Sequence, residues 1–247
     1  MNVLAVGAHP DDIEILAGGT LALYAAAGHR VTMAVVTNGN VGSPTLSRDE
    51  IAAVRRAEQE ASAALIGAEL VWMDFDDEWL FDDRPTRTAF IDVIRACQPD
   101  VVFAHGPTDY HPDHRISGQI VVDARIPAAV RLVETALPAA DKIPHLFLMD
   151  NVGGIDFAPE LHVDVTSVME TKERMLRCHE SQDTWLRAIY DGMDYVAFMR
   201  RQAGARGAEA GVTWAESFRE VKTYPPTGSA ALLPGTVIPA ASAGGAR

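Results

Sequence analysis

Apolar residues in the first half of the chain occur in short, nearly continuous runs, and segments with helical periodicity separate these runs. Such runs, bounded by glycine, proline or polar residues, are typical of strands buried on both faces of a parallel sheet. The predicted strands are Val3–Val6, Val31–Thr37, Glu69–Met73 and Val101–Ala104. The predicted helices are Gly18–Ala27, a segment that follows the N-cap Ser47 and stops at Gly67, and Thr86–Cys97.

Strands that alternate with helices at this spacing predict a parallel sheet built from right-handed strand–helix–strand units. The usual strand order in such sheets is 3-2-1-4, which makes the first and fourth strands neighbours. We therefore expect an α/β fold, with a Rossmann-like, mostly parallel sheet and helices on both of its faces. A ligand is expected in the crevice beyond the carboxyl ends of the first and fourth strands.

The second half is less regular and predicts a smaller C-terminal α/β part. Its predicted elements are strands near Leu146–Met149 and Leu161–Val165, helices over Thr166–His179 and from Thr184 to about Gln202, and a Gly/Ala-rich loop over Arg201–Gly211. We expect a single domain over residues 1–223, with a core over 1–135 and a C-terminal part over 136–223. Residues 224–247 are rich in Pro, Gly and Ala, and they predict a disordered tail or an arm docked on this or a neighbouring subunit.

Composition and charge narrow the class of protein. The chain has 247 residues, 48% of them hydrophobic, and a formal net charge of −13. This charge, without a cluster of Lys and Arg, argues against nucleic acid and anionic membranes as partners. No segment is long enough to insert in a membrane, and Cys97 and Cys178 form no spaced motif. We expect reduced thiols, a cytoplasmic location and, from the Pro-rich tail, a homo-oligomer as a plausible state.

Two His/Asp motifs follow the first and fourth predicted strands. The first is His9-Pro10-Asp11-Asp12 and the second is His111-Pro112-Asp113-His114. A histidine after a strand is usually only hydrogen-bonded, and an aspartate there is usually solvated or an N-cap. Because the predicted topology brings both motifs to one crevice, a metal site is the favoured interpretation. Imidazole nitrogens and carboxylate oxygens are ligands that zinc prefers.

The two motifs together resemble those of the PIG-L/LmbE-like zinc-dependent de-N-acetylases. The resemblance covers Asn2 to about Ala124 and extends more weakly into the second half. It implies a hydrolase that removes an N-acetyl or N-acyl group from a small molecule of the N-acetylglucosamine type. The roles it implies are zinc ligation by His9, Asp12 and His114, general-base catalysis by Asp11, assistance to the oxyanion or leaving amine by His111, and support of a ligand by Asp113.

The chemistry of amide hydrolysis suits these residues independently. The reaction needs an activated water, a stabilised oxyanion and a proton for the departing amine. Asp11 is one residue from a candidate ligand, so its carboxylate is expected to reach that water. His111 lies three residues from His114, which places both side chains at one pocket.

Four further residues are candidates for substrate contacts: Arg55, Asn38, Tyr110 and Trp79. Each also has a structural explanation, such as a surface ion pair, turn chemistry or an anchored loop. Some family members have a mobile tyrosine two residues before the first histidine of the second motif, whereas Tyr110 immediately precedes His111. A role for His179 in the pocket is left open.

Other functions remain compatible with the sequence. Within the family, an amidase of a larger thiol–sugar conjugate suits the same site. Two histidines and one carboxylate also describe a non-haem Fe(II) oxygenase, and Fe²⁺ remains an alternative to Zn²⁺. A nucleotide-binding module is disfavoured because no Gly-x-Gly-x-x-Gly follows the first strand. A non-catalytic metal sensor is not excluded.

Overall fold

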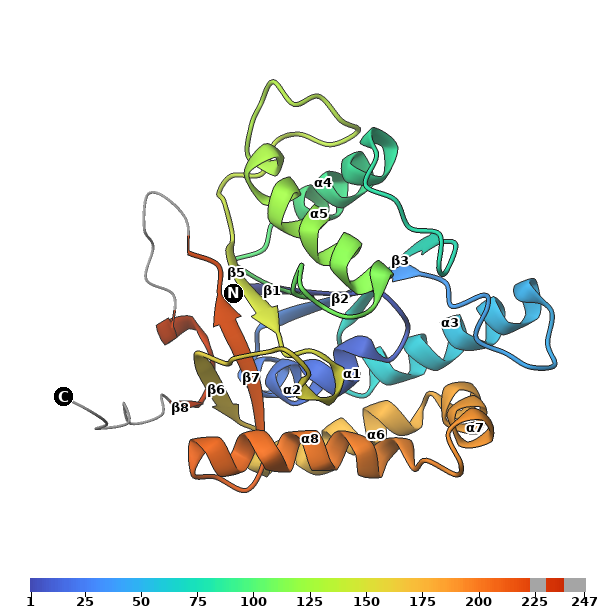
Figure 1. Cartoon of the computed structure of the whole chain (residues 1–247). Helices are drawn as coiled ribbons and strands as arrows, with labels where there is room; N and C mark the ends of the chain where they lie inside the picture. The colour runs from blue at the N-terminus through green and yellow to red at the C-terminus, as the bar shows by residue number, and fades with distance from the viewer. Residues whose placement is uncertain (223–229, 238–247) are drawn as a thin grey trace, which may run out of the picture.

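The computed structural model describes residues 1–222 and 230–237, and it shows one twisted sheet between two layers of helices (Figure 1). The order of the strands in the sheet is β3-β2-β1-β4-β5-β7-β6-β8. The first five strands in this order are mutually parallel, and the last three pair in antiparallel fashion. The strands are β1 (Asn2–Gly7), β2 (Arg30–Thr37), β3 (Glu69–Phe75), β4 (Val101–Ala104), β5 (His145–Met149), β6 (Leu161–Asp164), β7 (Ala215–Glu220) and β8 (Thr236–Val237).

The helices cover the two faces of the sheet unequally. They are α1 (Asp12–Leu16), α2 (Gly18–Ala26), α3 (Arg48–Ala64), α4 (Arg84–Cys97), α5 (Pro112–Ala128), α6 (Met169–Arg177), α7 (Glu180–Ile189) and α8 (Tyr195–Ala210), with short 3₁₀ turns η1 (Val152–Gly154), η2 (Thr166–Val168) and η3 (Ala230–Leu232). One core contains side chains of α1, α2, α6 and α8, and the other contains side chains of α4 and α5. Alternate residues of β1 enter opposite cores, as a doubly covered strand requires: Val3 the first and Leu4 the second.

The structure confirms the predicted α/β class and the strand order 3-2-1-4. In the register of the two central strands, Val6 of β1 is paired with Ala104 of β4. The chain leaves both strands at the same edge of the sheet, so the segments that begin at Ala8 and His105 start side by side. The predicted capping box at Ser47 and Glu50 is also present, at the start of α3.

Two predictions for the second half are wrong. The predicted loop over Arg201–Gly211 lies almost wholly within α8, where small residues permit close packing instead of breaking the helix. A Cβ atom at Gly207 would lie only 2.6 Å from the carbonyl oxygen of Thr213. The single helix predicted from Thr184 to about Gln202 is divided into α7 and α8, because the chain turns through a left-handed conformation at Asp191 and Gly192.

Part of the C-terminal tail lies on the sheet of the same chain. β8 pairs with β6, and the hydroxyl of Tyr24 donates a hydrogen bond of 2.7 Å to the carbonyl of Leu232. The remainder of the tail lies outside the described residues. Cys97 and Cys178 are free, as predicted. Within residues 1–222 and 230–237, no helix combines the length and the apolar character needed to cross a membrane.

Candidate metal centre and active site

Three side chains from the two motifs meet at the carboxyl ends of β1 and β4. Nδ1 of His9 lies 3.2 Å from Nε2 of His114. Oxygens of the Asp12 carboxylate lie 3.3 Å from the His9 nitrogen and 3.2 Å from the His114 nitrogen. Two imidazole nitrogens and the two oxygens of one carboxylate therefore lie close together, although they come from segments far apart in the sequence.

The loop after β1 is held in an unusual backbone conformation. Asp11 has φ 113°, a conformation that residues other than glycine rarely adopt, and it stands at the N-cap position of α1. The backbone N–H of His9 donates a 2.7 Å hydrogen bond to the Asp12 carboxylate, which closes the loop on itself. Such strain persists where the surroundings fix the chain, and it is frequent at functional sites. Here it directs the side chains of both aspartates toward the centre.

A carboxylate lies behind each of the two histidines. Nε2 of His9 is 3.1 Å from Asp77 and 3.5 Å from Asp113. Nδ1 of His114 is 3.2 Å from Asp109. In each imidazole, one nitrogen thus faces the centre and the other faces a buried acid. Carboxylates in this position fix the ring and its tautomer, as they do for metal-binding histidines.

His105 follows β4 directly and lies against the same group. Its Nε2 is 3.2 Å from the Asp12 carboxylate and accepts a 3.1 Å hydrogen bond from the backbone N–H of Ala8. Its ring stacks on that of His114 with 4.1 Å between the centroids. Burial lowers the pKa of His105, so its ring is neutral and serves as a packed support for the two ligating candidates.

Asp11 is buried beside the three-residue group and is surrounded by hydrogen-bond donors. Nη2 of Arg55 lies 3.4 Å from its carboxylate, and the Tyr195 hydroxyl donates a hydrogen bond to it. Burial raises the pKa of Asp11 to about 6, against the opposing effects of Arg55 and of His179. Arg55 is itself held by a 2.7 Å hydrogen bond to the carbonyl of Pro10. The carboxylate therefore has one fixed position.

His111 occupies the N-cap of α5 and presents one ring nitrogen to the cavity. Its Nδ1 accepts a hydrogen bond of 3.3 Å from the backbone N–H of Asp113. An acceptor nitrogen carries no proton, so the neutral ring bears its proton on Nε2. Burial, with the neighbouring His9 and His114, lowers the pKa of His111 and favours this neutral form. His111 is therefore a hydrogen-bond donor to the cavity.

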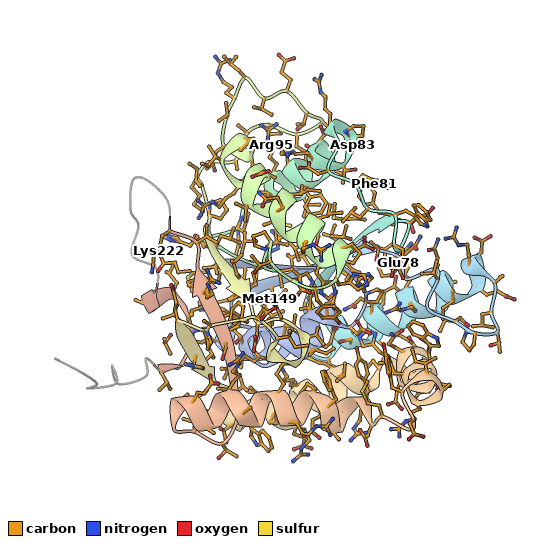
Figure 2. All side chains as sticks on the ribbon, in the orientation of Figure 1. Glu78, Phe81, Asp83, Arg95, Met149 and Lys222 are labelled. Atoms are coloured by element: carbon orange, nitrogen blue, oxygen red, sulfur yellow. The ribbon has the colours of Figure 1, made fainter. Side chains whose placement is uncertain are left out.

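A cavity of about 430 Å³ with two unlike sides is lined by five residues of the two motifs: His9, Asp11, Asp12, His111 and His114. One side is polar, comes from residues between 9 and 114, and includes Glu78, which Figure 2 labels on the loop after β3. The other side comes from the second half of the chain. We call six of its apolar and aromatic residues the apolar wall: Val152, Ile155, Trp185, Ile189, Tyr190 and Phe198.

The structure brings only some of the predicted substrate contacts into the cavity. Arg55 and Tyr110 line it, and burial raises the pKa of Tyr110 to about 12, so this hydroxyl keeps its proton at neutral pH. Asn38 is buried outside the lining, where its amide donates to Asp74. Trp79 also lies outside the lining and is 61% exposed.

Several residues of the centre were not predicted. Asp77 and Asp109 carried no motif signal, since acidic loop residues are common and only the folded chain places them behind the histidines. Tyr195 lies in the second half, within a segment predicted to be an ordinary helix. His179, whose role was left open, is fully buried and lies 3.4 Å from the carboxylate of Glu14. His179 is not among the residues that line the cavity.

The chain is similar to known deacetylases in sequence and in fold. Residues 4–125 match the model of the PIG-L family, described as GlcNAc-PI de-N-acetylase. The diacetylchitobiose deacetylase of Thermococcus kodakarensis is 32% identical over 197 residues, which cover 74% of this chain and 72% of that protein. The structure of N,N'-diacetylchitobiose deacetylase from Pyrococcus horikoshii superposes with a TM-score of 0.78 and 30% identity, over 89% of this chain and 83% of the other.

One relative has a different activity. The 4-oxalmesaconate hydratase of Pseudomonas putida is 26% identical over 191 residues, which cover 74% of each protein. The chain is thus similar to proteins named for two different reactions, a deacetylation and a hydration.

Proposed function

This chain belongs to the PIG-L family of GlcNAc-PI de-N-acetylases, and from that premise we propose that it is a zinc-dependent enzyme that removes the N-acetyl group of an amino-sugar compound. The observation that carries the proposal is the group formed by His9, Asp12 and His114, with Asp11 and His111 beside it. Metal ligation by these three residues and the catalytic roles of the other two are part of the proposal.

The donor atoms fit a zinc ion. Ligands at 2.0–2.1 Å from a tetrahedral zinc are about 3.3 Å apart, which follows from the bond lengths and the tetrahedral angle. The nitrogens of His9 and His114 are 3.2 Å apart, which matches that spacing, and one Asp12 oxygen lies 3.3 Å from the His9 nitrogen while the other lies 3.2 Å from the His114 nitrogen. Three protein ligands leave the fourth position for water or substrate, as in catalytic zinc sites. Fe²⁺ accepts the same donors, and metal analysis of the purified protein distinguishes the two ions.

The residues around the site supply the remaining needs of amide hydrolysis. When bound, a zinc ion supplies a Lewis acid and makes a water molecule more acidic. Asp11 accepts the proton of the water that attacks the amide carbon. Arg55 and Tyr195 hold that carboxylate in place during the transfer. As the carbonyl oxygen gains charge, Nε2–H of His111 donates a hydrogen bond to it.

The second half of the reaction breaks the carbon–nitrogen bond. The amine leaves with the proton that Asp11 took from the water, delivered directly or through His111. The products are acetate and the free amino sugar, so the step is balanced by one water and needs no further reactant.

The charge of the cavity favours the deacetylase over the hydratase. The substrate of the hydratase is an acid with several carboxylates, which are ionised at neutral pH. Among the described residues, the lining contains one arginine and no lysine, whereas four carboxyl groups line it, and their negative charge exceeds the positive charge of the arginine and one bound zinc ion: Asp11, Asp12, Asp77 and Glu78. An uncharged acetamido sugar suits such a lining better than a polyanion does.

A panel of compounds tests the proposal. N-acetylated amino sugars and their conjugates are incubated with the protein, with and without a chelator, and free amine and acetate are measured. We expect acetate and amine in equal amounts, lost with the chelator and restored by zinc without oxygen. Turnover of 4-oxalmesaconate with no amine from any sugar supports the hydratase instead, and a requirement for oxygen supports the iron oxygenase.

A further inference from the structure

The apolar wall lines the same cavity as the catalytic group. Its residues come from η1 and α7, from the residue that follows each of them, and from the first turn of α8, all outside the part of the chain that the family model matches. The polar side that holds the proposed chemistry comes from the matched part. The two sides therefore come from different parts of the chain. The polar side holds the proposed chemistry, and the wall is placed to contact the rest of the substrate.

Several side chains of the wall are exposed to solvent although they are large and apolar. The exposed fractions are 55% for Ile155, 48% for Ile189 and 60% for Tyr190. Single exposed apolar residues are ordinary on a protein surface, but a cluster around a cavity marks a binding surface. The cluster is continuous with the catalytic group, so its occupant is a part of the molecule whose amide lies at that group.

We infer that the substrate carries an apolar group, aromatic or alkyl, attached to its N-acylated amino sugar, and that this group packs on the apolar wall. The inference rests on the proposed function and specifies its substrate class. A second unmodified sugar is a poor occupant, because its hydroxyls lose hydrogen bonds to water when they are buried against hydrocarbon. Gln182 is one of the few amide or hydroxyl groups on this side, and the Tyr195 hydroxyl is already bonded to Asp11.

The apolar group has two alternative positions on the substrate. The group is either the aglycone at the anomeric carbon or an acyl chain longer than acetyl on the nitrogen. Both place hydrocarbon within reach of a wall that borders the reacting amide. The wall suits a hydrocarbon group at either position. Two series of substrates distinguish an aglycone from an acyl chain.

The first series is the methyl, propyl and hexyl glycosides of N-acetylglucosamine. The second keeps the methyl glycoside and changes the acyl group from acetyl to butanoyl and hexanoyl. Each buried methylene is worth about a fourfold gain in binding, so we expect kcat/KM to rise at least about tenfold along one series. If both series are flat, the inference is wrong even though the small substrate is hydrolysed.

Wall variants show where such a gain arises. Ile189→Asn and Ile155→Asn are expected to reduce the advantage of the longest compound over the methyl glycoside of N-acetylglucosamine at least about threefold. Ile143→Asn is the matched control, because Ile143 is 50% exposed and lies outside the cavity lining. The inference is wrong if the longest compound keeps its higher kcat/KM in both wall variants. It is also wrong if Ile143→Asn removes that difference as well.

A binding measurement separates this inference from the proposed function. Calorimetry of the zinc-loaded protein with the methyl and hexyl glycosides of glucosamine, which are amines, needs no turnover. Tighter binding of the hexyl compound, lost in Ile189→Asn, supports the wall even if no amide is cleaved. Equal binding of the two amines by the wild-type protein, with flat kinetics, contradicts the inference alone. Absence of amine release from every compound contradicts the proposed function.

Discussion

Nδ1 of His9 lies 3.2 Å from Nε2 of His114, although the two residues are 105 positions apart in the sequence. Two imidazole nitrogens at this distance either share a proton or direct their lone pairs at one cation. The adjacent Asp12 carboxylate adds a negative charge to the same point. The fold thus brings these electron pairs to a point where one divalent cation binds all of them.

The carboxylates behind the histidines are expected to tune metal affinity. We expect Asp77→Asn and Asp109→Asn each to weaken zinc binding about 10- to 100-fold, because the amide is a poorer acceptor for the ring N–H of His9 or His114. Competition with a fluorescent chelator measures the change. Asp141→Asn, at an exposed position remote from the cavity, is the control. Wild-type affinity in both variants contradicts the assigned role.

His111 has two separable roles, and two substitutions divide them. In His111→Asn, the side-chain oxygen still accepts the N–H that begins α5, but the donor at Nε2 is lost. We expect kcat to fall about 100-fold or more with little change in the free energy of unfolding. His111→Ala loses the cap as well and is expected to cost about 1 kcal/mol in addition. Near-normal kcat in His111→Asn, measured with full metal content, contradicts the donor role.

Metal binding is expected to release protons. In the metal-free protein, burial lowers the pKa of His114, but Asp12 and Asp109 outweigh it and raise the pKa to about 9. The pKa of His9 is also raised, since Asp113, Asp12 and Asp77 outweigh its burial. A metal binds only the neutral rings, so its affinity should increase with pH until about pH 9.

Calorimetry at pH 7 in two buffers of different ionisation enthalpy counts the protons released. We expect between one and two per zinc, and an apparent Kd that falls between pH 6.5 and pH 8.5. No proton release and a constant Kd over that range are inconsistent with ligation by His9 and His114.

The position of α5 is set by a glycine. A Cβ atom at Gly118 would lie 2.3 Å from the carbonyl oxygen of His105, so α5 approaches the end of β4 more closely than any other residue permits. We expect Gly118→Ala to lower the free energy of unfolding by about 1–3 kcal/mol and to weaken zinc binding, because it displaces His114. Chemical denaturation and metal titration measure the two effects.

Gly207→Ala is the matched control for this change. It has a similar backbone clash, with Thr213, but far from the centre. We expect comparable destabilisation with unchanged metal affinity. Equal loss of affinity in both variants indicates that general destabilisation is responsible.

Patterns that depend on local sequence predicted much of this molecule. The apolar runs predicted β1, β2 and β4, because a strand buried on both faces must be almost wholly apolar, and they also predicted the edge strand β3. The usual order of strands in such sheets predicted that His9 and His114 lie close together. Residues such as Asp77 and Tyr195 could not be found this way. Each acts through a contact across the fold, and its neighbours in sequence carry no corresponding signal.

The second half shows the limit of composition as a guide. Glycine and alanine over Arg201–Gly211 indicated a loop, but their small size serves the contact between α8 and the chain at Thr213. Similarly, Trp79 was expected at the substrate because of its aromatic ring, and the structure leaves it exposed outside the cavity. Among the aromatic residues that do line the cavity, Trp185 lies in α7 and Tyr190 directly follows it, in a segment with no recognisable motif.

Metal content and acetate release, measured on the same samples of wild type, His114→Ala and Asp11→Asn, test the central claim most directly. We expect about one zinc per chain and turnover in the wild type, neither in His114→Ala, and in Asp11→Asn full zinc with kcat reduced about 100-fold or more. Wild-type turnover in His114→Ala, or in Asp11→Asn with zinc near one per chain, would contradict it.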